Sequence, residues 1–317
     1  MLCLQYSKKL NGGNQVLTAV YNEINDIEKK SFIYLTNNPL QSLITIFFKN
    51  RNTPILVSDP FCSFLLFLSF RSKVIHFVQS DDINLFKRYG FLFNIIYKNF
   101  YKIMMCNKKW YRIFNSNYSQ ECFSKHFKLD IHKSYIVPIL GIKALFPTNL
   151  VKIYNVKNKN NFIWIGSKHT FKGGKTFIKA INKTESIGHM IFNGEVPKWA
   201  INKKNIYVDS NLKRMDILNI IRNYSALVYT SEFDSFAMPI FEALLVGCDV
   251  IAIQNKSIEL NHTNNYIFCV SSAEELCSTM SNFCGNKKKL KQKINWEREH
   301  KKLVKWRTKI KFEIRNI

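Results

Sequence analysis

The sequence is poor in acidic residues and lacks the patterns that mark a metal centre or a disulfide framework. It contains 22 Asp and Glu against 47 Lys and Arg, which gives a formal net charge of +25. Its eight cysteines are scattered, with no C-x-x-C pair and no histidine cluster at metal-ligand spacing. Neither a zinc site nor a set of disulfides is predicted, and a reducing cytosol is the expected location.

Long apolar runs are also missing. The most apolar window, FCSFLLFLSF (61–70), is far shorter than the ~20 residues that a helix needs to cross a bilayer. The first ten residues, MLCLQYSKKL, contain no apolar stretch of signal-peptide length. A soluble or peripheral protein is therefore expected. No internal repeat of fixed period and no low-complexity tract is found.

What the chain does have is enough apolar sequence for two domains, because its 317 residues are 46% hydrophobic. The excess of positive charge predicts an acidic partner, which could be nucleic acid, an anionic membrane or a phosphorylated substrate. Lys greatly outnumbers Arg, and Asn and Ile are abundant, as in AT-rich coding sequences. Part of the charge is therefore background and favours no one of these partners.

Strand and helix patterns alternate along the chain. In the first half, four runs predict strands: LCLQYS, SFIYLT, PILVSD and KVIHFVQS. After a Pro-containing connection around 138–161, five more follow: FIWIGS, HMIFNG, NIYVDS, ALVYTS and DVIAI. This alternation is typical of two doubly wound α/β sheets in tandem. The expected boundaries are 1–147, 148–297 and 298–317, the last a charged helical segment that could pack back on the first domain.

The stretch SEFDSFAMPIFEALLVG (231–247) places two acids, Asp234 and Glu242, between two predicted strands. Pro239 is expected where a helix begins and Gly247 at its C-terminal cap. Asp234 then belongs to the loop and Glu242 to the first turn of the helix. Ligands of parallel sheets bind beyond the carboxyl ends of the strands, where both acids are expected. The alternative is that Glu242 complements the helix dipole and Asp234 is a solvated loop acid.

A second candidate motif opens the second domain. FIWIGSKHTFKGGKTFIKAI (162–181) predicts a strand that ends at Gly166, a basic loop and a helix. The free N–H groups of the helix start and the ammonium groups of Lys168, Lys172 and Lys175 could bind phosphate. The spacing fits neither a G-x-G-x-x-G fingerprint nor a Walker loop. Solvated lysines beside a glycine turn are the alternative interpretation.

Taken together and in this order, the two motifs resemble the donor-binding half of the family 4 glycosyltransferases, which are retaining enzymes. In that family a strand ending in Gly-Arg precedes a Lys-Gly six residues after the Gly, and a Glu-x7-Glu signature with a Phe-Gly-Leu-Pro-like core follows. Gly166 and Lys172 keep the first spacing, and Asp234 and Glu242 keep the second. The resemblance covers roughly residues 135–285, including VPILGIKALFP, which is similar to the family's start of the second domain.

The first half resembles the family more loosely. NGGNQV (11–16), which includes Gly13, is similar to a Gly-Gly loop near the N-terminus, and KVIHFVQSDD (73–82) to a strand whose His or Gln faces the cleft. IFNSNYSQECF also matches a family segment. This half is shorter than usual in the family, so trimmed acceptor loops are expected.

The resemblance implies the GT-B fold, in which two facing Rossmann-like domains hold the active site in the cleft between them. It implies a retaining, metal-independent glycosyltransferase that moves a sugar from a nucleotide diphosphate sugar to a hydroxyl of a saccharide or a lipid-linked acceptor, in glycan or surface polysaccharide biosynthesis. No cofactor beyond the donor substrate and no nucleic-acid partner are expected. The expected location is cytoplasmic, with peripheral attachment to the inner face of the membrane left open.

The resemblance also gives the residues roles. Lys172 would neutralise the donor diphosphate, helped by the backbone N–H groups that follow Asp234 at the helix start. Glu242 would bind the ribose and Asp234 the hydroxyls of the transferred sugar. His76 would contact the sugar from the facing domain, although a histidine at a strand end is often structural. The remaining donor-binding candidates are Gly13, Gly166, Lys168, Phe236, Ala237 and Met238.

Two departures from the family pattern stand out. Ser167 replaces the Arg expected after Gly166, so its phosphate contact is lost unless Lys168 supplies it, without the bidentate geometry of arginine. Asp234 replaces a Glu and is one methylene shorter. The adjacent acids at 81 and 82 do not have the spacing of a metal-binding D-x-D, so no metal is expected.

Basic, aromatic and aliphatic residues are interleaved in NLFKRYGFLFNIIYKNFYKIMMCNKKWYRIF (84–114). Such a segment could bind nucleic acid, lie on an anionic membrane or form a buried helix with basic edges. Two rivals to an active enzyme follow from the sequence as a whole. One is a non-catalytic relative that binds sugar nucleotides or glycans, and the other is a basic nucleic-acid-binding protein, which no recognised motif supports.

Overall fold

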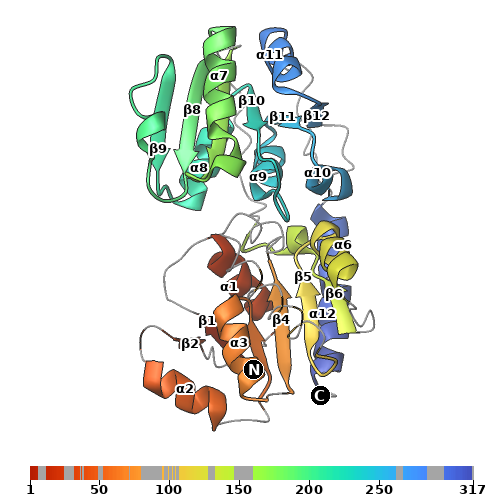
Figure 1. Cartoon of the computed structure of the whole chain (residues 1–317). Helices are drawn as coiled ribbons and strands as arrows, with labels where there is room; N and C mark the ends of the chain where they lie inside the picture. The colour runs from red at the N-terminus through yellow and green to blue at the C-terminus, as the bar shows by residue number, and fades with distance from the viewer. Residues whose placement is uncertain are drawn as a thin grey trace. The chain divides into compact units, whose positions relative to one another are not determined.

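The computed structural model describes residues 1–5, 12–24, 32–35, 37, 39–48, 53–70, 72–79, 95, 99, 102, 104, 107–127, 133–145, 160–261, 267–283 and 296–315 (Figure 1). The chain divides into two compact units. The first combines Met1–Leu145 with Trp296–Ile317, and the second is Phe146–Asn295. These boundaries lie close to the expected ones after residues 147 and 297.

The first unit contains a parallel six-stranded sheet in the order β2-β1-β3-β4-β5-β6. Its strands are β1 (Leu2–Gln5), β2 (Phe32–Tyr34), β3 (Ile55–Val57), β4 (Val74–Val78), β5 (Tyr111–Phe114) and β6 (Ser134–Ile136). Its helices are α1 (Gly12–Ile24), α2 (Pro39–Phe47), α3 (Pro60–Leu68), α6 (Asn117–His126), the 3₁₀ turn η2 (Ile139–Gly141) and α12 (Trp296–Arg315). The predicted strands of this half correspond to β1–β4, whereas β5 and β6 were not predicted.

The second unit contains another parallel six-stranded sheet, in the order β12-β11-β10-β7-β8-β9. Its strands are β7 (Asn161–Gly166), β8 (Ile187–Phe192), β9 (Ile206–Ser210), β10 (Ala226–Tyr229), β11 (Asp249–Ile253) and β12 (Ile267–Val270). Its helices are η3 (Thr170–Lys172), α7 (Gly174–Thr184), η4 (Lys198–Ala200), α8 (Arg214–Ile221), α9 (Met238–Val246), α10 (Lys256–Asn261) and α11 (Ala273–Ser281).

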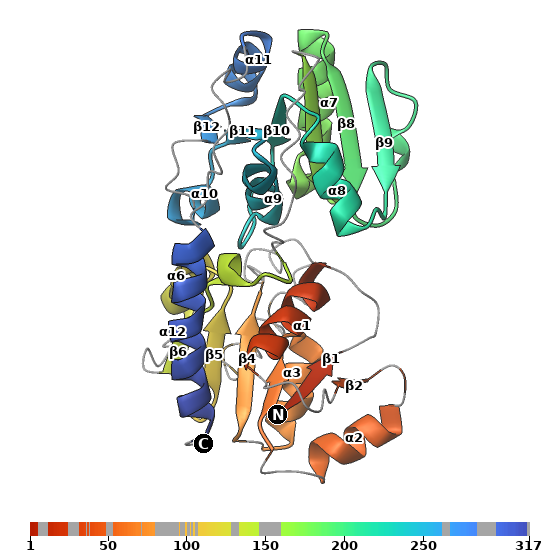
Figure 2. The same ribbon diagram turned by 180° about the vertical axis from the view of Figure 1, so that it is seen from behind.

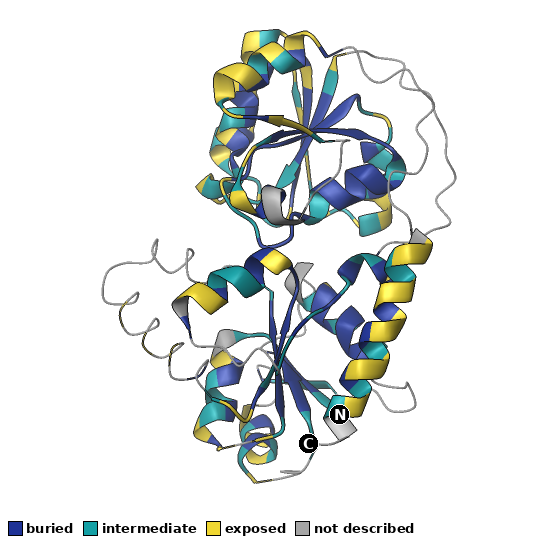
Figure 3. Ribbon diagram, turned by 90° about the vertical axis from the view of Figure 1, so that its right-hand side faces the viewer, coloured by how far each residue is buried: buried dark blue, intermediate teal, exposed yellow. Residues whose placement is uncertain are grey.

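The strand order of the second unit fixes where a ligand can bind. The first strand, β7, has β8 on one side and β10 on the other, so successive connections run in opposite directions from it. Such a switch point leaves a crevice beyond the carboxyl ends of the two central strands. The central strands β10 and β11 are buried, as the dark blue strands in Figure 3 show, whereas the edge strands β9 and β12 keep exposed residues. Aromatic side chains of β7 and α7, Trp164 and Phe177 among them, fill the core below this edge.

The end of the 84–114 segment is part of the first unit's core. Trp110 has no exposed surface, and Arg112 on β5 is buried, with its guanidinium donating to the carbonyl oxygens of Trp110 (3.2 Å) and Asn107 (2.9 Å). The expectation that this segment as a whole is a helix or a binding surface is therefore wrong for residues 110–114. Most of residues 84–106 lie outside the described part of the chain.

A single helix, α12, forms the C-terminal segment and packs on the first unit. Figures 1 and 2 show it alongside β5 and β6, and Leu303 and Ile310 bury their side chains there. Arg307 also pairs with Glu23 on α1, at 3.5 Å. The closest approach is at Gly141, where an added Cβ would lie 2.6 Å from the carbonyl oxygen of Glu299.

We predict that Gly141→Ala loosens α12 from the first unit. The added methyl group would overlap the helix backbone, and overpacking of this kind costs about 1–3 kcal/mol. Amide hydrogen exchange along residues 296–315 should therefore accelerate, together with a fall in the free energy of unfolding in urea. Lys143 is exposed and lies two residues from Gly141, so Lys143→Ala is the control and should leave hydrogen exchange in α12 unchanged. Equal exchange in the two variants would contradict the close packing.

Candidate active site

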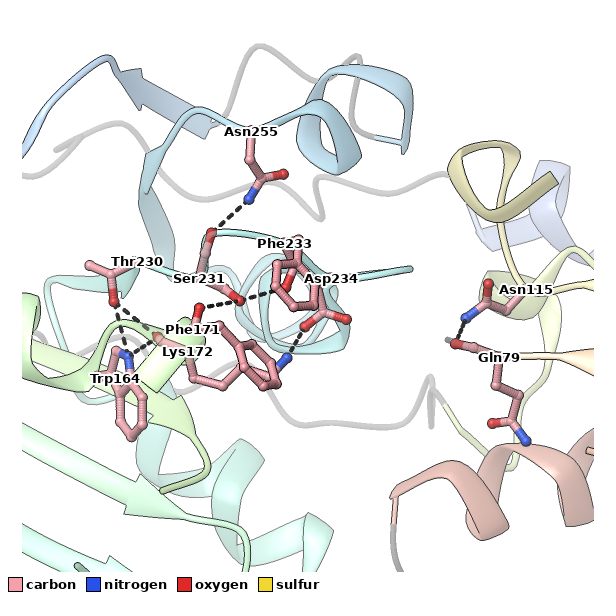
Figure 4. Close-up of polar contacts among 10 residues, drawn as sticks. All are labelled: Gln79, Asn115, Trp164, Phe171, Lys172, Thr230, Ser231, Phe233, Asp234 and Asn255. Atoms are coloured by element: carbon pink, nitrogen blue, oxygen red, sulfur yellow. Dashed lines mark hydrogen bonds and ion pairs between the residues drawn. The ribbon is translucent and has the colours of Figure 1, made fainter. Parts of the chain in front are cut away.

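The loop after β7 is held in place by an indole. Gly166 ends β7, and a Cβ there would lie 2.4 Å from the ring of Trp164, so only glycine leaves room for this tryptophan. The indole Nε1–H points to the carbonyl oxygen of Lys172 (3.2 Å) and to the hydroxyl of Thr230 (3.1 Å) (Figure 4). Trp164 therefore fixes the backbone that carries Lys172 against the end of β10.

Gly173 lets the chain turn at the same place. It adopts a left-handed conformation with φ of 72°, and a Cβ would lie 2.1 Å from the carbonyl oxygen of Thr230. The hydroxyl of Thr230 donates to the carbonyl oxygen of Gly173 at 2.9 Å. Close packing against the Thr230 backbone therefore explains Gly173, and the phosphate-binding role expected for this loop stays a prediction.

Lys172 and Asp234 meet although 62 residues separate them. The Nζ atom of Lys172 lies 2.5 Å from Oδ2 of Asp234, and both side chains keep part of their surface exposed (Figure 4). Burial alone would raise the pKa of Asp234, but the charge of Lys172 and the hydrogen bonds to the carboxylate together outweigh it, so the pKa lies below its usual value. The backbone N–H of Ala237 also hydrogen-bonds to this carboxylate and acts in the same direction. Asp234 is therefore ionised at neutral pH.

Backbone hydrogen bonds and ring stacking join the same two loops a second time. Phe171 and Phe233 stack with ring centroids 4.6 Å apart, and the N–H of Glu232 donates to the carbonyl oxygen of Phe171 at 2.8 Å. Ser231 accepts at its carbonyl oxygen from the Asn255 amide at 2.8 Å, which ties the loop to the region after β11 (Figure 4). The Lys172–Asp234 pair therefore sits on a framework that does not depend on the pair itself.

Glu242 lies on α9, one turn further than expected. The helix begins at Met238, with Pro239 in its first turn and Gly247 as its C-terminal cap in a left-handed conformation. Pro239 and Gly247 are thus confirmed as its start and end signals, but Glu242 is in the second turn. Its side chain is buried and pairs with Arg214 at the start of α8, at 3.0 Å. Burial raises the pKa of Glu242, and the Arg214 guanidinium offsets part of that rise.

Arg214 was missed by the sequence analysis. It lies in NLKRMD, directly after β9, and no motif marks it. A basic residue just beyond a strand end was the available signal, but the chain has 47 Lys and Arg. In such a background one more arginine carries little information.

Three expected donor contacts find other partners. Lys168 is exposed and pairs with Glu195 at 2.7 Å, and this pairing lowers the pKa of Glu195. Ala237 directs its N–H at Asp234, and Phe236 stacks on Phe241 with ring centroids 4.7 Å apart. Met238 is the first residue of α9. The role of these residues towards a phosphate stays a prediction.

His76 is not at a strand end. It lies in the middle of β4, with no exposed surface, and its ring meets Trp110 edge-on at 6.3 Å. Burial, followed by the charge of Arg112, lowers the pKa of His76 to about 3. The expected position at the sheet edge is therefore wrong, and a neutral imidazole in the core has no route to a sugar. Gly13 lies in the first turn of α1, after residues 6–11, which are outside the described part of the chain.

The residue that does follow β4 is Gln79. Its side-chain amide donates to the hydroxyl of Ser58 at 2.8 Å. Its backbone carbonyl oxygen accepts from the side-chain amide of Asn115 at 2.6 Å (Figure 4). Ser58 follows β3 and Asn115 follows β5, so three neighbouring strands end in one neutral polar network. The sequence carries a signal for this network, because a polar residue follows each of the three strands, in VSD, VQS and FNS. Such endings are too common to have predicted it.

No metal cluster is found among the described residues, that is, no group of three or more His, Cys, Asp and Glu placed to hold an ion. The acids at positions 81 and 82 lie outside the described ranges. The expectation that no metal is needed stays a prediction.

No protein-family model matches this sequence, and no curated protein matches it. Solved structures do. Anabaena Alr3699/HepE, in complex with UDP and glucose, is similar with a TM-score of 0.69 and 12% identity over 97% of this chain and 99% of its own. WaaG, a glycosyltransferase involved in lipopolysaccharide biosynthesis, gives 0.65 and 12% over 99% of both chains. A trehalose 6-phosphate synthase from Burkholderia multivorans gives 0.58 and 9%, over 96% and 83%. At these identities the likeness shows the fold, which is the GT-B fold expected from the sequence.

We predict that Gly173→Ala destabilises the second unit more than Gly194→Ala. Both glycines have a positive φ, 72° and 103°, so alanine is strained at either position, but a Cβ at 194 meets nothing within 4 Å. The additional clash with Thr230 should cost about 1–3 kcal/mol. Urea unfolding, monitored by hydrogen exchange in residues 160–261, measures the difference in the free energy of unfolding between the two variants. Equal losses would mean that the Thr230 contact does not constrain the loop.

We also predict that, if the second unit binds a nucleotide through Glu242, Arg214→Ala changes the pH dependence of that binding. If the ionised Glu242 accepts hydrogen bonds from a ribose, binding weakens as the pH falls through the pKa of Glu242. Removing the nearby guanidinium takes away the charge that holds the pKa of Glu242 down, so this pKa rises further and the loss should begin at higher pH. Calorimetric titration with a nucleoside diphosphate across pH 5–8 tests this.

Lys213 is an exposed neighbour of Arg214, so Lys213→Ala should leave the pH dependence of nucleotide affinity unchanged. Glu242→Gln should abolish that pH dependence. A profile of Arg214→Ala that coincides with that of the unmodified protein would separate Arg214 from the nucleotide site. Circular dichroism checks that each variant folds, because breaking a buried ion pair destabilises proteins by roughly 3–5 kcal/mol.

Proposed function

We propose that this chain is a retaining glycosyltransferase that takes its sugar from a nucleotide diphosphate sugar. The observation that carries the proposal is the Lys172–Asp234 pair at the switch point of the second sheet, with a buried Glu242 on the adjoining helix. A cation paired with one acid, with a second acid on the helix that follows, suits a ligand with a diphosphate in its middle and hydroxyl groups at both ends. The GT-B fold supports the proposal, because its solved examples above include glycosyltransferases.

In the proposed reaction, the bond between the anomeric carbon and the terminal phosphate oxygen breaks, and its electron pair leaves with the nucleoside diphosphate. The acceptor hydroxyl oxygen bonds to the anomeric carbon on the face that the phosphate leaves, and its proton passes to an oxygen of the leaving diphosphate. Negative charge grows on the leaving phosphate, so an ammonium close to it stabilises the transition state more than the ground state. Lys172 supplies that charge. The donor would share the ammonium with Asp234, which holds it in place before the donor arrives.

Asp234 and Glu242 are assigned the two ends of the donor. Asp234 is ionised and partly exposed, so its second oxygen can accept from a hydroxyl of the transferred sugar. Glu242 would accept from the ribose, with its carboxylate oriented by Arg214. Because HepE was crystallised with UDP and glucose, and with UDP-glucose, uridine diphosphate hexoses are the first donors to test.

The acceptor is proposed to be a hydroxyl of a saccharide or of a lipid-linked glycan, in the cytoplasm and without a bound metal. The neutral network of Gln79, Ser58 and Asn115 suits an uncharged acceptor group, because amides and hydroxyls both donate and accept hydrogen bonds. No helix in the described ranges is long and apolar enough to cross a bilayer. The membrane contact expected from residues 84–114 cannot be placed on that segment, most of which is outside those ranges.

We predict that Lys172→Ala remains folded and keeps its donor dissociation constant within about tenfold, while sugar transfer falls by at least about a hundredfold. The ground state loses one of several phosphate contacts, whereas the transition state loses the charge on which the leaving group depends. Donor turnover and calorimetry with UDP-hexoses measure the two quantities separately. Lys179→Ala removes an exposed ammonium from the middle of α7 and should change neither.

A folded Lys172→Ala variant with most of its turnover would contradict the role of Lys172 and much of the proposed function. Lys172→Arg keeps the charge but changes its geometry, so intermediate activity is expected. If the unmodified protein binds nucleotide sugars but neither hydrolyses nor transfers them, the non-catalytic alternative is correct. Ser167, in place of the family's arginine, is the residue that favours this alternative.

A further inference from the structure

Three bases at the carboxyl edge of the second sheet each pair with an acid from a neighbouring loop or helix. The pairs are Lys168–Glu195, Lys172–Asp234 and Arg214–Glu242. Charge cancels within each pair, although the chain as a whole carries a formal net charge of +25. These three bases therefore offer a diphosphate no surplus of positive charge, and a ligand that gains one of them must compete with its acid.

The Lys172–Asp234 pair is placed where a ligand can divide it. Its side chains are 24% and 21% exposed, and Figure 4 shows them meeting from two loops that follow neighbouring strands. Lys168 and Glu195 are more than half exposed, so water and salt screen that pair. A partly buried pair is screened less. An anion that reaches Lys172 therefore also meets the field of Asp234.

Asp234 keeps its position when Lys172 turns to a ligand. The N–H of Ala237 hydrogen-bonds to its carboxylate, and a bond of this kind favours the charged form. The loop itself is fixed by the stack of Phe233 on Phe171, with ring centroids 4.6 Å apart, which does not involve the ion pair. A ligand that draws the ammonium away therefore leaves a carboxylate that needs another hydrogen-bond donor.

The two nucleotides of the proposed reaction present different groups to this carboxylate. A nucleotide diphosphate sugar ends in hydroxyl groups, which donate hydrogen bonds to carboxylates. The nucleoside diphosphate that is left after transfer ends in a terminal phosphate, which loses a second proton near pH ~6. Asp234 therefore gains a donor from the nucleotide sugar, whereas the free nucleotide brings it a like charge.

We propose that Asp234 makes the site select the nucleotide sugar over the free nucleoside diphosphate, through an exchange of partners with Lys172. The diphosphate takes a share of the ammonium, and a hydroxyl of the sugar donates to Asp234 in return. After transfer this hydroxyl leaves with the acceptor, so Asp234 recovers Lys172 and the hold on the product weakens. This inference rests on the proposed function, because it requires a nucleotide sugar as donor.

Calorimetric titration of the full-length protein with UDP and with a UDP-hexose measures this selection. Asp234→Asn removes the repelling charge and releases Lys172, so the affinity for UDP should rise by at least about tenfold, since like charges placed together are costly. The affinity for the UDP-hexose should rise less, because the charge-assisted hydrogen bond from the sugar hydroxyl is weakened by the same change. Asp234→Ser also removes the charge and carries the same expectation for UDP, should the amide disturb the loop.

The double variant Lys172→Ala/Asp234→Asn separates an exchange of partners from simple repulsion. Repulsion alone acts on UDP whether or not the ammonium is present. If Asp234 also competes for Lys172, its removal helps UDP less once the ammonium is gone. The gain in UDP affinity from Asp234→Asn should therefore be at least about threefold smaller in the Lys172→Ala background, a coupling usual for residues in contact. Equal gains in the two backgrounds would overturn the exchange.

Glu232→Gln is the matched control. Glu232 is exposed, lies two residues before Asp234, and loses the same charge while it keeps the backbone N–H that donates to Phe171. Both affinities should stay within about twofold of those of the unmodified protein, because an exposed charge is screened. Folded Asp234 variants that bind UDP no more tightly would overturn this inference and leave the proposed function standing. An unmodified protein that binds neither UDP nor UDP-hexoses would overturn both.

Discussion

The contact between the loops that follow β7 and β10 is the constraint on which the candidate site depends. Because β7 and β10 are neighbours in the sheet but distant in the sequence, Lys172 and Asp234 meet only once the parallel sheet has formed. Trp164 and Thr230 hold the first loop against the end of β10. The ion pair is therefore a result of the fold, and the loops would stay joined if a ligand drew Lys172 away.

The two acids of the site have opposite electrostatic settings. The pKa of Asp234 is lowered, because the Lys172 charge and the hydrogen bonds to the carboxylate together outweigh burial. Its ionisation therefore adds stability above pH ~4 that is lost as the pH falls through its folded pKa. The pKa of Glu242 is raised by burial, so its ionisation removes stability as the pH rises above ~4.5. Acids whose environments separate their pKa values usually have different tasks. Asp234 suits permanent acceptance of hydrogen bonds, whereas Glu242 depends on Arg214 for its charge.

The sequence predicted more of the second unit than of the first, for physical reasons. Pro239 and Gly247 stand at backbone positions that few residues can fill, so they predicted the start and end of α9. The spacing of Gly166 and Lys172 and that of Asp234 and Glu242 predicted the fold through the family resemblance. His76 was placed wrongly because an alternating or continuous apolar strand does not reveal where it ends, and Gln79 takes the edge position instead. Arg214 could not be selected among so many bases. β5 was missed because its residues continue a basic, aromatic segment without a turn signal.

Ala237 departs from the family 4 pattern that this sequence resembles, and the departure has a structural cost. The Phe-Gly-Leu-Pro-like core has glycine where this chain has Ala237, and the residue adopts a left-handed conformation with φ of 52°. For a residue with a Cβ this conformation costs roughly 1–2 kcal/mol, and such strain persists where the surroundings fix it. Here the N–H of Ala237 bonds to Asp234, and the methyl group is fully buried. The strained turn therefore orients Asp234 from its backbone side while Lys172 holds it from the other loop, and an acid fixed from two loops is better ordered than either contact alone would make it.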